Sequence, residues 1–155
     1  MTEQMTLPPI ADLLPHRGTM LLLDRVLAFD AESASAECTP RRDAWYADTN
    51  GDMPAWIGIE LMAQTVAAQI GLHKRSAGEP PKHGVLLGTR RYAATRPAFA
   101  AGEALLIRAV LAYRDASGLG AYDCSILAGG AEIASATLKI FEPDDFKTFQ
   151  QASPT

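Results

Sequence analysis

One carboxylate, Glu60, stands in an otherwise apolar stretch, DMPAWIGIELMAQTVAAQIGL, which spans residues 52 to 72. Ionised carboxylates are rarely buried without a partner, because removing them from water costs free energy. A carboxyl group held in an apolar wall is suited to act as a general acid or base near neutral pH. Glu60 is therefore the first candidate for a catalytic group. The alternatives are a buried carboxylate satisfied by structural hydrogen bonds and one that is exposed near a helix start.

The stretch around Glu60 has the pattern of a helix that is apolar on almost every face. Successive residues of an α-helix are about 100° apart, so Gln64 lies about 40° from Glu60, on the same face. Thr65 and Gln69 lie about 140° and 180° away from Glu60. The polar groups thus form two separate spots and no solvent-facing stripe, which predicts a helix that other elements surround.

The start of this helix offers further chemistry. Asp52 is the predicted N-cap, Pro54 suits the first turn, and the helix is expected to end near Arg75. Free backbone N–H groups around Ala55 to Gly58 would polarise a carbonyl oxygen, and a glycine lets a substrate approach the backbone closely. We expect four residues to contact the substrate: Ala55, Trp56, Gly58 and Gln64.

The remaining chain predicts the strands that must position this helix. The expected strands cover residues 20–30, 33–38, 83–97, 103–115, 119–127 and 131–143, and the last four are expected to form a meander. A short helical turn is expected near the start of residues 8–19. Apolar and polar residues alternate cleanly in the final strand, which fits an antiparallel sheet. A curved antiparallel sheet wrapped around one apolar helix is an α+β arrangement, the hotdog fold, and pairing two protomers edge to edge would hide an open sheet edge.

Composition bounds the class of protein. The 155 residues suffice for one domain, with a core expected at about 8–142 and a tail at 143–155. The net charge of -4 and the isoelectric point of about 5.3 argue against nucleic-acid and anionic-membrane partners. Cys38 and Cys124 have no CxxC spacing, so we expect free, buried thiols and no metal site. No signal peptide is visible, polar residues interrupt the apolar stretch, and a cytoplasmic protein is expected.

Three segments in register carry a resemblance to a known family. LPHRGTMLLLDRV (14–26) resembles the "LPHR…LLVDRV" opening of the FabZ-type 3-hydroxyacyl-carrier-protein dehydratases. MPAWIGIELMAQTVAA (53–68) resembles their "PG…EAMAQ" helix, and GVLLGTRRY (84–92) stands where they carry a "G…ARF" strand. The form around Glu60 is closer still to the ApeP-like dehydratases found with aryl-polyene synthesis genes.

The resemblance implies a reaction, a partner and a site. A (3R)-hydroxyacyl thioester, carried on the phosphopantetheine arm of an acyl carrier protein, loses water to give the trans-2-enoyl thioester, and no cofactor takes part. In the family a histidine of one subunit faces a carboxylate of the other subunit at a dimer interface. Glu60 matches that carboxylate.

The family's catalytic histidine, in a "GHFP" loop before the helix, is missing here. Tyr46 stands fourteen positions before Glu60, where that histidine would align. A tyrosine, with an ordinary pKa near 10, is a poor base at neutral pH. We expect His16 of the LPHRG loop to take over and to pair with Glu60 across the dimer. The alternative is that His16 only holds its loop by hydrogen bonds.

The missing motif leaves three functions open. The first is a homodimeric dehydratase that uses His16 and Glu60. The second is a non-catalytic hotdog subunit that pairs with an active paralogue in a heterodimer. The third is an acyl thioesterase, since hotdog thioesterases also place a carboxylate on the central helix, although the LPHR and MAQ segments favour the dehydratases.

Overall fold

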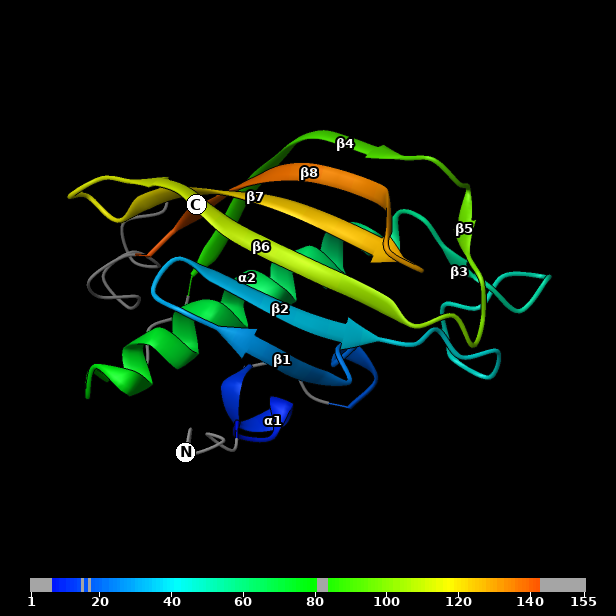
Figure 1. Ribbon diagram of the computed structural model, residues 1–155, viewed down its shortest axis with the longest axis horizontal. Coiled ribbons are helices and arrows are strands. Elements are labelled where there is room, and N and C mark those ends of the chain that lie inside the picture. The colour runs from blue at the N-terminus through cyan, green and yellow to red at the C-terminus, as the bar shows by residue number, and fades with distance from the viewer. Residues whose placement is uncertain (1–6, 15, 17, 81–83, 143–155) are drawn as a thin grey trace, which may run out of the picture.

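The computed structural model describes residues 7–14, 16, 18–80 and 84–142, and one long helix dominates it (Figure 1). This helix, α2 (Ile57–Ser76), packs against a six-stranded antiparallel sheet that curves around it. Eleven of its twenty residues are buried, on several faces of the helix. The predicted α+β plan of one wrapped helix is confirmed.

The six strands of the main sheet pair in the order β1-β2-β6-β7-β8-β4. Their bounds are β1 (Arg25–Phe29), β2 (Ser33–Cys38), β4 (Val85–Ala94), β6 (Leu105–Arg114), β7 (Leu119–Ala128) and β8 (Ala131–Phe141). The predicted four-stranded meander is wrong in its first member, because β4 pairs with β8 and not with β6. After β4 the chain passes the start of α2 and rejoins the sheet beside β2, so β4 becomes an edge strand.

A second, two-stranded sheet holds the entrance to α2. It pairs β3 (Met53–Pro54) with β5 (Ala98–Phe99), and neither strand was predicted. The prediction that Asp52 caps the helix is wrong, because its Oδ1 accepts a hydrogen bond from the Ala101 amide at 3.0 Å. The helix begins only at Ile57, after Pro54 has been drawn into β3.

The N-terminal segment forms α1 (Ile10–Leu13), as predicted, and a short 3-10 turn, η1 (Gly18–Met20). The strand predicted for 20–30 begins only at Arg25. The physical reason lies in the amides of Leu22 and Leu23, which donate to the side chain of Gln64 at 3.0 Å and 3.4 Å instead of to a neighbouring strand.

The buried polar residues of α2 tie the helix to the sheet. Gln69 Nε2 donates to the carbonyls of Asp30 and Ala31, in the turn between β1 and β2, at 3.1 Å and 3.0 Å. Gln69 Oε1 accepts from the buried hydroxyl of Tyr122 at 2.8 Å, and Arg114 Nη2 donates to that hydroxyl at 2.8 Å. Burial raises the pKa of Tyr122 to about 12, so the hydroxyl remains a donor at neutral pH.

The other sequence expectations divide between described and undescribed residues. Cys38 and Cys124 are free and buried, as predicted, and burial raises the pKa of each thiol to about 12. The predicted tail at 143–155 lies outside the described residues. Within the described ranges no helix combines the length and apolarity needed to cross a membrane, and no cluster of three potential metal-binding side chains occurs.

We expect Tyr122→Phe to lower the free energy of unfolding by about 1–3 kcal/mol, because Gln69 Oε1 then lies buried without the hydroxyl donor it has now. Urea denaturation followed by circular dichroism measures the change. Tyr113→Phe is the matched control, because Tyr113 is exposed on the neighbouring strand. Equal losses in the two variants would contradict this account.

Candidate active site

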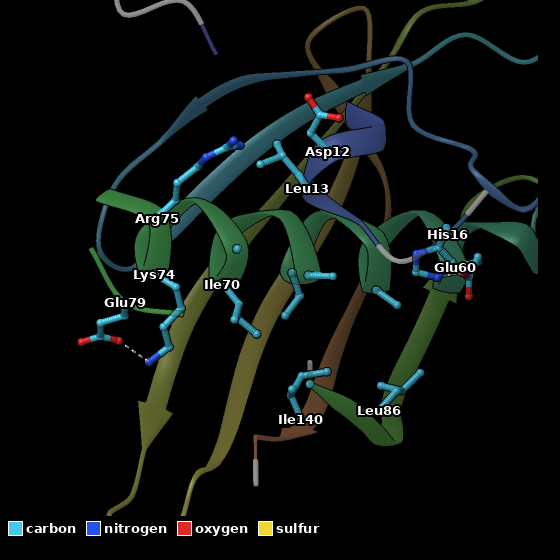
Figure 2. Close-up of a pocket in the computed structure, with 15 residues that line it drawn as sticks. Asp12, Leu13, His16, Glu60, Ile70, Lys74, Arg75, Glu79, Leu86 and Ile140 are labelled. Atoms are coloured by element: carbon cyan, nitrogen blue, oxygen red, sulfur yellow. Dashed lines mark ion pairs between the residues drawn. The ribbon is translucent and has the colours of Figure 1, made fainter. Parts of the chain in front are cut away.

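The structure brings His16 and Glu60 together. His16 Nε2 lies 3.2 Å from Glu60 Oε1, and the two side chains are 27% and 36% exposed, so both reach an accessible surface (Figure 2). His16 comes from the segment between α1 and η1, and Glu60 from the first turn of α2. The arrangement differs from the expected contact across two subunits, because the pair forms within one chain.

The fully buried side chain of Gln64 holds the Glu60 carboxylate of this pair in place. One turn after Glu60, Gln64 Nε2 donates to Glu60 Oε1 at 3.0 Å and to the Met20 carbonyl at 2.7 Å. Its Oε1 accepts from the amides of Leu22 and Leu23. Both polar atoms of the side chain are thus occupied, and the side chain is 0% exposed. We expected Gln64 to contact the substrate, whereas the structure places it behind Glu60, where it orients the carboxylate.

A cavity of about 610 Å³, here called the α2 groove, runs along one side of the helix from the His16–Glu60 pair. Its wall on α2 is made of small or apolar residues: Ala63, Val66, Ala67, Ile70 and Gly71. Leu13, Leu86 and Ile140 line it from α1, β4 and β8. The groove follows the helix for about 21 Å, from Glu60 to Lys74.

The far end of the α2 groove is charged and nearly neutral in sum. Lys74 Nζ lies 2.9 Å from Glu79 Oε2, the ion pair drawn in Figure 2. Arg75 lies at the same end, and Asp12 lines the groove from α1. The groove therefore has the His16–Glu60 contact at one end, an apolar middle and charged residues at the other end, and its apolar middle could hold an apolar chain.

The first turn of α2 differs from the expected cluster of free amides. The Ala55 amide donates to the Pro97 carbonyl at 2.9 Å, and the Gly58 amide donates to the Ala55 carbonyl at 2.9 Å. The amides of Trp56 and Ile57 remain, with no acceptor anywhere in the described part of the chain. Only these two of the expected N–H groups are therefore available to a substrate oxygen.

Two other expected substrate contacts also lie differently. A Cβ atom at Gly58 would meet the hydroxyl of Tyr92 and Ile126 Cδ1, so protein atoms fill the space that we expected a substrate to use. Trp56 is 64% exposed and lies outside the groove lining. Sequence reasoning missed Tyr92 altogether, because nothing in the pattern of its strand indicates that its side chain reaches the helix start.

Tyr46, which stands where relatives carry a histidine, has a structural environment. Its hydroxyl accepts a hydrogen bond from the Arg41 amide at 3.1 Å, and its ring packs edge-on against Trp45 at 5.7 Å. Burial is the main cause that raises the pKa of Tyr46, so even less of it is deprotonated at neutral pH than of a free tyrosine, and it is poorly suited to act as a general base there. Tyr46 does not line the α2 groove, and His16 is the histidine that the structure places beside Glu60.

Comparisons with known proteins agree with this geometry. The ApeP-like family, described as ApeP dehydratase, matches residues 8–151. A chain of the dehydratase heterocomplex ApeI:P from Xenorhabdus doucetiae is 27% identical, with a TM-score of 0.87 over 96% of this chain and 100% of that chain. No curated protein sequence matches.

More distant structures share the fold alone. Cj0977, a sigma28-regulated virulence protein from Campylobacter jejuni, is 14% identical, with a TM-score of 0.68 over 88% of this chain and 89% of that chain. A hypothetical thioesterase protein with coenzyme A, from Streptococcus pneumoniae, is 13% identical, with a TM-score of 0.62 over 76% and 84% of the two chains. Because the ApeP-like match covers almost the whole length, the chain belongs to the ApeP-like dehydratase family.

Proposed function

We propose that this protein dehydrates a (3R)-hydroxyacyl thioester on an acyl carrier protein to the trans-2-enoyl thioester, with His16 and Glu60 as the acid–base pair. The observation that carries the proposal is the 3.2 Å contact between His16 Nε2 and Glu60 Oε1 at the end of an apolar groove. A histidine and a carboxylate are the groups that such an elimination needs, one to take a proton and one to give one.

In the proposed mechanism His16 removes a proton from C2 of the substrate. Glu60, in its protonated form, gives its proton to the C3 hydroxyl, and the C3–O bond breaks to release water as the C2–C3 double bond forms. The proton now on His16 then returns to Glu60. The direct contact between the two side chains allows this return without a relay residue.

The start of α2 supplies the proposed site for the thioester oxygen. Negative charge develops on that oxygen when C2 loses its proton, and hydrogen-bond donors aimed at it lower the barrier. The amides of Trp56 and Ile57 lie at the positive end of the helix dipole, one turn before Glu60. They are the donors that this chain offers for the task.

The proposed assembly pairs two hotdog subunits along β4. This ten-residue strand is bonded to β8 on one side only, and it carries exposed Leu86 and Leu87. An open apolar edge of this length favours pairing with another strand. Because Leu86 also lines the α2 groove, a subunit paired there would cover the site. The heterocomplex of the relative makes a paralogue a second candidate for that subunit, beside another copy of this chain.

A non-catalytic role within such a heterodimer is the second candidate function. It is favoured by Tyr46, which occupies the place of the usual loop histidine and is engaged in structural contacts. The thioesterase alternative has only a likeness of fold behind it.

We expect the purified protein to convert 3-hydroxyacyl carrier protein to a product that is lighter by one water, as measured by mass spectrometry. His16→Ala and Glu60→Gln should each reduce the rate by about 10²-fold or more, because each removes a proton-transfer group. His73→Ala and Glu132→Gln are the controls, since both lie outside the α2 groove.

Full activity of His16→Ala would contradict the assigned pair. No water loss from any chain length, with or without a hotdog paralogue, would contradict the dehydratase proposal. Water loss by the paralogue alone, with this chain only raising its stability, would favour the non-catalytic role. Release of a free thiol would indicate a thioesterase, because dehydration leaves the thioester intact.

We expect Gln64→Leu to lower kcat by about 10- to 100-fold with little change in KM, because Glu60 loses the donor that orients its carboxylate. Steady-state kinetics on the carrier-bound substrate measure the two constants separately. Gln69→Leu is the matched control, since it removes a buried amide of the same helix that does not contact Glu60. An equal fall of kcat in both variants would indicate a general loss of stability.

We expect Ala67→Phe to reduce turnover of long acyl chains by about tenfold or more while short chains are still processed, because the added ring fills the middle of the α2 groove. A series of hydroxyacyl chains of increasing length measures the effect. Ala112→Phe, on an exposed part of β6, is the control. A uniform loss over all lengths would contradict the groove as the acyl site.

A further inference from the structure

Ala55, two residues before α2, is bonded both to β4 and to the segment that joins β4 to β5. Its amide donates to the Pro97 carbonyl at 2.9 Å, and its carbonyl accepts a hydrogen bond from the Tyr92 hydroxyl. Two residues earlier, Met53 pairs with Phe99 in the small sheet. The entrance to α2 is therefore fixed to the edge-strand side of the molecule, where β4 arches over the helix (Figure 1).

The same Tyr92 hydroxyl packs against the first turn of α2. A Cβ atom at Gly58 would meet this hydroxyl, and Ile126 Cδ1 would lie 3.1 Å away. Only a residue without a side chain fits here while the hydroxyl is present. Since Gly58 is two residues before Glu60, the hydroxyl touches the helix about half a turn from the carboxylate.

A β-bulge in β4 presents Tyr92 to the helix. Arg90 pairs with Thr137 and Ala93 pairs with Ser135, so two residues, Arg91 and Tyr92, lie opposite one position of β8. Arg91 has a φ of 55°, and among the described residues it is the one non-glycine with a positive φ. Such a conformation is costly for an arginine, and backbone strain of this kind is concentrated at functional sites.

We propose that Tyr92 is a positioning residue for the dehydration: through Ala55 and Gly58 it fixes the start of α2, and with it Glu60 and the amides of Trp56 and Ile57, to edge strand β4. The proposal rests on the function proposed above. Because β4 is also the edge along which the second subunit would pair, Tyr92 links assembly to the geometry of the site. Burial raises the pKa of Tyr92, so its hydroxyl stays protonated and can donate at neutral pH.

The test is a double-mutant cycle on Tyr92 and Gly58. Tyr92→Phe should lower kcat by about tenfold or more with KM changed by less than about twofold, because the helix start loses its tether while the groove stays intact. Gly58→Ala should lower kcat further, because the new methyl group meets the hydroxyl. In Gly58→Ala/Tyr92→Phe the hydroxyl is absent and the closest remaining contacts of the new Cβ are Ile126 Cδ1 at 3.1 Å and the ring Cζ at 3.3 Å, so kcat should recover toward the level of Tyr92→Phe.

Free energies of unfolding measured in parallel separate positioning from folding, and Tyr113→Phe, exposed on β6, is the control. A wild-type kcat in Tyr92→Phe, or a double variant no better than Gly58→Ala, would overturn the role of Tyr92. A change in stability alone, with kcat unaffected, would also overturn it. If neither the wild-type protein nor Tyr113→Phe releases water from any substrate, the proposed function fails and this proposal fails with it. If both are active and Tyr92→Phe is equally active, only the role of Tyr92 fails.

Discussion

The site depends on one buried side chain, the amide of Gln64. Four hydrogen bonds join it to Glu60 and to the backbone at Met20, Leu22 and Leu23. A buried amide with both atoms satisfied is costly to disturb, because any displacement leaves a polar group unpaired. The carboxylate on α2 and the segment that follows His16 are therefore fixed by the same interaction, and the distance between His16 and Glu60 is set within one chain.

This constraint accounts for a site without the usual loop histidine. In place of that histidine stands Tyr46, whose hydroxyl and ring are committed to the loop itself. A histidine from the N-terminal segment reaches Glu60 instead, and it does so because Gln64 draws the chain after it against the helix. The same bonds delay the start of the first strand to Arg25, so the shortened β1 and the contact between His16 and Glu60 have one cause.

Features that depend on residue type and periodicity could be predicted from the sequence. Features that depend on long-range backbone contacts could not. The apolar pattern of α2 and the alternation in β8 follow from the residues alone, and the residue types alone also single out Glu60 as a candidate. The position of β4 does not, since alternation shows which face of a strand is buried but not which strand lies beside it. The helix start was misjudged because Asp52 caps nothing and bonds to Ala101, a long-range contact that no local pattern indicates. Residue type singled out Gln64 as a candidate. Its place behind Glu60 could not be predicted, because it depends on how residues 20–23 fold against the helix.

Glu60 thus lies between two constraints of different origin. On one side Gln64 ties it to the N-terminal segment, which belongs wholly to this chain. On the other side Tyr92 ties the start of its helix to β4, whose outer edge is open to a second subunit. A change in β4 would reach the helix start through the bulge at Arg91, whereas Gln64 holds Glu60 to the segment that follows His16. Under the proposed function, assembly should therefore act mainly on the amides proposed to bind the thioester oxygen, and less on the proposed His16–Glu60 pair.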